Sequence, residues 1–174
     1  MAKPGETIVK QYLESNGLIA IKIPESNIKV VDFEVHAKGE LAFYLEEKTL
    51  ELTPLAWKSK DPVYNAIAKH IKEAVKQFKS VNPDKRVPNA LAITNKDPNR
   101  NVNHLFSTLT GQVITASGKL HWINNLKSIE DDLSLIDLYL WFDNDQLSGH
   151  IWEGDCLEHQ DKLTFLLGLM DYYN

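Results

Sequence analysis

The chain has 174 residues, of which 43% are hydrophobic, and this is enough apolar material for one well-packed globular domain. Its longest apolar stretches, such as TFLLGLM, are far shorter than the ~18 residues that a membrane span needs. The N-terminus lacks the basic-then-apolar pattern of a signal peptide, and the single cysteine, Cys156, excludes an intramolecular disulfide. We therefore expect a cytoplasmic protein with no membrane partner.

The first half of the chain is predicted to contain two helices and four strands. Pro4 and Gly5 favour the start of a helix, and Asn16-Gly17 favours its end. A long helix is predicted over 63–80, where apolar residues recur at helical spacing. Alternating or continuous apolar runs predict strands at 18–23, 28–36, 40–50 and 89–95.

The second half is predicted to be richer in strands. The segment ITASGKLHWI favours a hairpin that turns at Ser117-Gly118, and two further strands are expected in IDLYLWF and SGHIWEG. A final helix is predicted at about 157–172. The fold class is therefore α/β, with a mixed central sheet flanked by helices in a single domain over 1–174. Its core is expected at about 4–95, with a C-terminal elaboration at about 96–174.

Asp32, Glu46 and Lys48 form the most informative pattern. They stand on two predicted strands joined by a short turn, and side chains alternate between the two faces of a strand. Glu46 and Lys48 therefore share one face, and Asp32 on the neighbouring strand is expected to meet them. Two carboxylates suit Mg²⁺, for which Mn²⁺ can substitute, and a nearby ammonium can stabilise developing negative charge or help to deprotonate water.

These residues resemble the PD-(D/E)XK, or restriction-endonuclease-like, nucleases. That family carries an acidic residue on one strand and an acid-any-lysine motif on the next, which Asp32, Glu46 and Lys48 match. The resemblance covers about residues 5–95. It implies a restriction-endonuclease-like fold and Mg²⁺-dependent endonuclease cleavage of DNA, with Asp32 and Glu46 as metal ligands.

The resemblance also implies roles for three more residues. Glu6 matches a glutamate in the first helix, Gln77 matches a glutamine in the helix after the lysine strand, and Glu47 would offer its backbone carbonyl to the metal. Two positions depart from the family pattern. Val31 stands where proline is frequent, and Glu47 stands where a buried valine or isoleucine is usual, so its carboxylate needs a partner if it is buried.

Charge is distributed unevenly along the chain. The net charge is −3 for residues 1–57, +6 for 58–100 and −8 for 101–174. The basic middle third predicts contacts with the phosphates of a nucleic acid near the proposed metal site. The residues expected to make these contacts are Lys58, Lys60, Lys69, Lys72 and Lys76.

Several alternatives remain open from the sequence. One is a catalytically degenerate nuclease fold that only binds nucleic acid or protein. Another is an interaction or immunity-type protein whose acidic C-terminal third binds a basic partner, and a third is an enzyme of the same fold that acts on RNA. A homodimer is also compatible with the sequence, since cutting both strands of DNA often requires two active sites.

Overall fold

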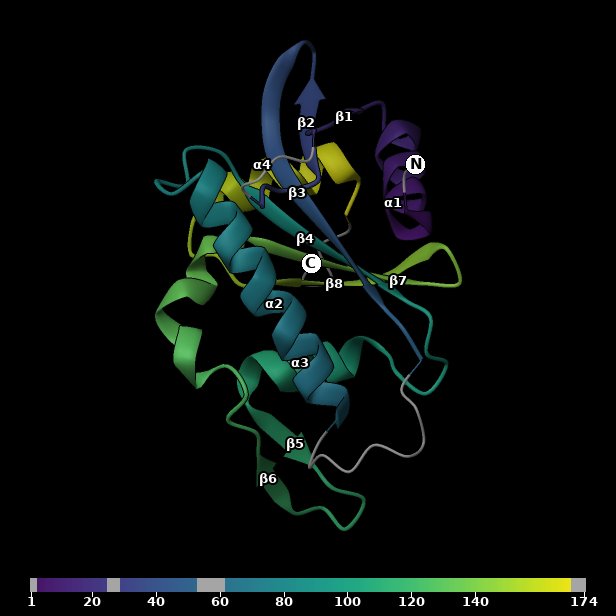
Figure 1. The fold of residues 1–174 in the computed structure, drawn as a ribbon, viewed down its shortest axis with the longest axis vertical. Helices are drawn as coiled ribbons and strands as arrows, with labels where there is room; N and C mark the ends of the chain where they lie inside the picture. Colours follow the sequence, from purple (N-terminus) through teal and green to yellow (C-terminus); the bar gives the residue numbers. More distant parts are fainter. Residues whose placement is uncertain (1–2, 25–28, 53–61, 170–174) are drawn as a thin grey trace.

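The computed structural model describes residues 3–24, 29–52 and 62–169. A six-stranded sheet with the order β1-β2-β3-β4-β7-β8 runs through the molecule (Figure 1). The strands β3, β4 and β7 are mutually parallel, whereas the outer pairs are antiparallel. This arrangement confirms the prediction of an α/β protein with a mixed central sheet. The six strands are β1 (Ile19–Lys22), β2 (Phe33–Ala37), β3 (Glu40–Leu50), β4 (Asn89–Asn95), β7 (Leu138–Asp143) and β8 (Gln146–Trp152).

Helices cover both faces of this sheet. Apolar residues of α1 (Pro4–Ser15) and α4 (Leu157–Leu167) form one core with the sheet, and those of α2 (Pro62–Val81) form a second core on the opposite face. In Figure 1, α2 crosses in front of the strands and α4 lies behind them. The second core also includes α3 (Val102–Thr110) and the 3₁₀ segment η1 (Lys127–Leu135). Because both faces are covered, β4 and β7 are buried almost throughout, as their continuous apolar sequences require.

A separate hairpin of β5 (Gln112–Ile114) and β6 (Leu120–Trp122) projects from the end of α3 (Figure 1). It confirms the hairpin predicted from ITASGKLHWI. Gly118 lies in the turn with φ of +76°, a conformation that glycine adopts without steric cost.

Three features of the fold differ from the sequence prediction. The strand β2 begins at Phe33 rather than at residue 28, so Asp32 lies immediately before the strand and not within it. The helix α4 ends at Leu167, where Gly168 adopts a left-handed conformation. The helices α3 and η1 were not predicted. Within the described ranges, no helix combines the length and apolar character needed to cross a membrane.

Candidate functional site

The candidate site lies where β3 extends beyond its neighbour β2. The last residue pair between these two strands is Phe33 and Leu45. Beyond it, the segment from Glu46 to Leu50 continues to pair with β4 on its other side. Along the edge that faces β2, this part of β3 has no neighbouring strand in the described part of the chain. The backbone N–H and C=O groups on that edge therefore need other hydrogen-bond partners.

Asp32 supplies the missing partners at this edge. Its backbone N–H donates to Oε2 of Glu46 at 2.9 Å, and its own Oδ2 accepts from the backbone N–H of Glu47 at 2.9 Å. Carboxylate side chains thus replace the hydrogen bonds that another strand residue would have made. These two bonds bring Asp32 and Glu46 together, as the alternation of the strands suggested.

Lys48 and Gln77 join the same cluster from β3 and α2. The ammonium of Lys48 lies 2.7 Å from Oε1 of Glu46 and donates to Oε1 of Gln77 at 2.9 Å. Gln77 in turn donates through Nε2 to the carbonyl of Val30 at 2.8 Å and is only 7% exposed, so it is not an ordinary surface glutamine. Glu73, one helical turn earlier in α2, lies 3.8 Å from the Lys48 ammonium.

Glu6 reaches the cluster through Lys22, a residue that the sequence analysis did not single out. The Lys22 ammonium lies 2.7 Å from Oε1 of Glu6 and 3.0 Å from Oδ1 of Asp32. The other oxygen of Glu6 accepts from the backbone N–H of Lys3 at 3.3 Å, which caps the start of α1. Lys22 is the last residue of β1 and pairs with Phe33, the neighbour of Asp32. The strand register therefore places Lys22 beside Asp32, and the sequence alone did not reveal that register.

Glu47 points to the opposite face of β3, where it is buried with partners of its own. It is 5% exposed and accepts hydrogen bonds from the hydroxyls of Thr49, at 2.8 Å, and Thr94. Gly5 of α1 packs against it, since a Cβ at that position would lie 2.1 Å from Oε1 of Glu47. Burial raises the pKa of Glu47 above its usual value, while the two hydroxyls oppose this shift. The unusual glutamate is thus accommodated by two threonines and a glycine.

Burial and neighbouring charges also shift the pKa values of Glu46 and Lys22. Burial raises the pKa of Glu46 from 4.5 to about 7, and the negative charge of Asp32 adds to this shift while Lys48 opposes it. Burial acts to lower the pKa of Lys22, but its hydrogen bonds to Glu6 and Asp32 outweigh that effect and raise the pKa overall. Lys22 is therefore a firmly charged group, whereas Glu46 can hold or release a proton near neutral pH.

The carboxylate oxygens of Asp32 and Glu46 already accept hydrogen bonds or ion pairs from the protein. The two oxygens of Asp32 contact the Lys22 ammonium and the Glu47 N–H, and those of Glu46 contact the Lys48 ammonium and the Asp32 N–H. In the part of the chain that the structure describes, no group of three or more His, Cys, Asp or Glu side chains is arranged to hold a metal. A divalent ion bound here would share these carboxylates with the ammonium groups of Lys22 and Lys48.

The structure describes three of the five lysines that were predicted to bind nucleic acid. Lys69 and Lys76 are exposed on α2, and Lys72 is half-buried on the same helix. Among the described residues, no ion pair involves any of these three, so their charges remain available to phosphates. Lys58 and Lys60 lie outside the described residues.

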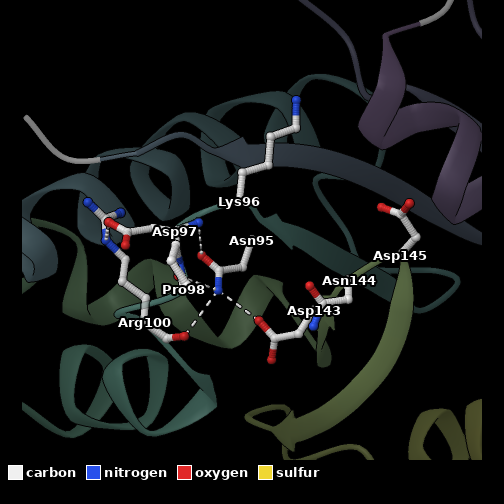
Figure 2. Close-up of a pocket in the computed structure, with 8 residues that line it drawn as sticks. All are labelled: Asn95, Lys96, Asp97, Pro98, Arg100, Asp143, Asn144 and Asp145. Atoms are coloured by element: carbon white, nitrogen blue, oxygen red, sulfur yellow. Dashed lines mark hydrogen bonds and ion pairs between the residues drawn. The ribbon is translucent and has the colours of Figure 1, made fainter.

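A polar pocket of about 800 Å³ lies elsewhere, between the carboxyl ends of β4 and β7 (Figure 2). Asn95 lies at its centre and donates through Nδ2 to Oδ1 of Asp143 at 2.7 Å and to the carbonyl of Arg100 at 3.1 Å. Oδ2 of Asp143 accepts from Trp141 and Ser148, and Arg100 is buried against Asp97 at 3.1 Å. These bonds tie the loops at the strand ends together, and none of the sequence-predicted site residues lines this pocket.

A second pocket of about 730 Å³ opens beside the candidate cluster. It is lined by Glu6 and Lys22 of the cluster and by Phe33, Lys3 and Lys10 around it. The Glu6 end of the cluster can therefore be approached from outside, past the basic side chains of α1.

Comparison with known proteins adds no identification. The chain matches no protein-family model, no curated protein and no solved structure.

Proposed function

We propose that the protein is a metal-dependent nuclease that hydrolyses DNA phosphodiester bonds, with Asp32, Glu46 and Lys48 as its central residues. The observation that carries the proposal is the single hydrogen-bonded cluster that joins these three residues to Gln77 and, through Lys22, to Glu6. The proposal includes a restriction-endonuclease-like fold, to which the mixed sheet and its flanking helices conform at the coarse level.

The donor chemistry of the cluster fits Mg²⁺ or Mn²⁺. Asp32 and Glu46 offer hard carboxylate oxygens at a site that is largely shielded from water, and Mg²⁺ is commonly held by one or two carboxylates together with substrate phosphate. The backbone carbonyl of Glu47 is the third ligand in the proposal. When bound, the ion supplies Lewis-acid activation of water and neutralises phosphate charge.

The protein's own residues perform the remaining steps. Lys48, only 16% exposed, is held between Glu46 and Gln77, so its ammonium has a defined position from which to orient the attacking water and stabilise the charge that develops on the phosphate. Gln77 positions Lys48 and is itself anchored to Val30. The lysines of α2 hold the flanking phosphates of the nucleic acid.

The experiment is cleavage of labelled DNA by the wild type, Asp32→Asn and Lys48→Met in Mg²⁺, Mn²⁺ and EDTA. We expect metal-dependent cleavage by the wild type and a loss of ~10²-fold or more in each variant, the scale at which a transition-state donor contributes. Lys10→Met is the matched control, because Lys10 pairs with Glu14 on the surface of α1 and should leave the rate unchanged. Full activity of Lys48→Met, with a native circular dichroism spectrum, would refute the assignment. Labelled RNA in parallel reactions identifies the preferred nucleic acid.

A second candidate function is nucleic-acid binding without cleavage. It is favoured by the occupancy of the carboxylate oxygens, since Lys22 and Lys48 already neutralise the charges that would attract a metal. A protein of this kind would retard DNA on a gel equally well in Mg²⁺ and in EDTA, and would cut neither DNA nor RNA.

A further inference from the structure

Lys22 occupies a distinctive position at the edge of the cluster. Its ammonium contacts carboxylates from two different elements, Glu6 of α1 at 2.7 Å and Asp32 before β2 at 3.0 Å. It also lies 5.3 Å from the centre of the Phe33 ring, within the range of a cation–π contact. Three separate contacts therefore hold one compact positive charge in place.

Glu6 depends on this charge. Its side chain is 2% exposed, and a buried carboxylate is costly unless it is paired and hydrogen-bonded. Lys3 also approaches Glu6, but its ammonium remains 3.7 Å away and its side chain is 66% exposed. Lys22 is thus the principal counter-charge of Glu6.

A cation bridging two carboxylates from different elements is also what a divalent ion does in a two-metal site. We propose that Lys22 is a built-in cation that occupies the Glu6 side of the cluster, so that the protein binds one divalent ion, at Asp32 and Glu46, and excludes a second ion between Glu6 and Asp32. This inference rests on the proposed metal-dependent function. Lys22 is a positioning residue, because it acts by holding Asp32.

The contrast with Lys48 supports separate roles for the two lysines. Lys48 has one close carboxylate partner, Glu46 at 2.7 Å, with Glu73 farther away at 3.8 Å. Lys22 has two close carboxylate partners, at 2.7 and 3.0 Å. Removing the charge of Lys22 leaves Glu6 and Asp32 without the ammonium that contacts both of them. That arrangement creates a new site for a divalent cation.

The experiment is a titration with Mn²⁺ followed by electron paramagnetic resonance, which counts bound ions without any need for activity. The wild type is expected to bind one Mn²⁺, Lys22→Met two, and Lys22→Arg, which keeps the positive charge, one. Lys10→Met is the control, since Lys10 lines the same pocket but pairs with Glu14, and it should bind one. If Lys22→Met does not fold, Lys22→Gln replaces it with the same expected count, because its amide can still donate to Glu6.

The results separate this inference from the proposed function. One ion in both the wild type and Lys22→Met, at unchanged affinity, would overturn the role of Lys22 and leave the metal site intact, as would two ions in the wild type. No ion in the wild type but one in Lys22→Met would support the role of Lys22 and overturn metal-dependent catalysis. No ion in either protein would overturn both.

Discussion

At the scale of single residues, Glu46 combines burial with the close negative charge of Asp32. Its pKa of about 7 means that the folded protein keeps a proton which an ordinary glutamate, with a pKa of 4.5, releases in the unfolded chain. The unfolded state therefore binds fewer protons between these two pH values. The contribution of Glu46 to stability is greatest below pH 4.5 and declines as the pH rises to about 7.

Glu46→Gln should remove this pH dependence. We expect the free energy of unfolding of the metal-free wild type, relative to Glu46→Gln, to fall between pH 4.5 and pH 7 by up to roughly 3 kcal/mol and then to level off. Urea denaturation in EDTA across this range measures the difference. Parallel pH profiles for the two proteins would show that Glu46 ionises like an ordinary carboxylate.

Gly5 is a second residue whose identity is dictated by its surroundings. A Cβ there would lie 2.1 Å from Oε1 of Glu47 and 2.5 Å from the hydroxyl oxygen of Thr94. Alanine normally stabilises a helix by ~1 kcal/mol relative to glycine, but the overpacking expected here costs about 2 kcal/mol.

We therefore expect Gly5→Ala to lower the free energy of unfolding, measured by urea denaturation. The cost should shrink when the same change is made in a Glu47→Ala background, because the nearest obstacle is then removed. An equal cost in the two backgrounds would show that contact with Glu47 does not explain the glycine.

At the scale of secondary-structure elements, α2 links the cluster to the expected nucleic-acid surface. Its inward side carries Gln77, and its outward side carries Lys69 and Lys76. Replacing both lysines with alanine should weaken DNA binding and reduce the slope of log affinity against log salt by ~1.8, since each phosphate contact contributes ~0.9. Fluorescence anisotropy at several salt concentrations measures this slope.

A matched control is available for the α2 lysines. Lys119 of the β5–β6 hairpin and Lys162 of α4 are also exposed and lie on other elements. The double variant Lys119→Ala/Lys162→Ala removes the same total charge and should leave the slope unchanged. Equal reductions in the two double variants would mean that overall charge, and not the surface of α2, governs binding.

Much of the element pattern could be predicted because its signals are local. The strand β4 begins and ends where its apolar run predicts, at 89–95, and α1 starts and stops at its Pro-Gly and Asn-Gly signals. The helix α3 was missed although Asn101 caps it and Gly111 ends it. Short amphipathic segments such as α3 and η1 depend on packing against α2 and the sheet, which a local pattern does not specify.

The relative placement of the candidate side chains could also be predicted in part. The alternation of side chains along β3 was sufficient to place Glu46 with Lys48 and to separate Glu47 from them. The bridge from Lys22 to Glu6 was not predictable, because it requires the pairing of β1 with β2 and the packing of α1. The hydrogen bonds that the two threonine hydroxyls donate to the buried Glu47 were not predictable for the same reason. One threonine lies on β3 and the other on its partner strand β4.

At the scale of the whole molecule, the C-terminal strands belong to the same sheet as the candidate site. The strand β7 pairs with β4, and its side chains enter both cores, with Leu140 on one face and Tyr139 and Trp141 on the other, each 0% exposed. A fragment that ends after β4 would expose these two cores.

A truncated chain of residues 1–96 should therefore fail to fold. We expect it to lack the near-ultraviolet circular dichroism of the full chain and to unfold without a cooperative transition, whereas the full chain should show one transition in urea. A cooperatively folded 1–96 fragment would show instead that the first half of the chain is an independent unit.

The most direct measurement for the central claim is the location of Mn²⁺ by anomalous scattering in crystals of the full chain. We expect an anomalous peak contacting the carboxylates of Asp32 and Glu46, with the ammonium of Lys22 still on Glu6. A structure in Mn²⁺ with no peak at these carboxylates, and with Lys48 still paired to Glu46 as it is without metal, would contradict the assignment of this cluster as a metal-dependent nuclease site.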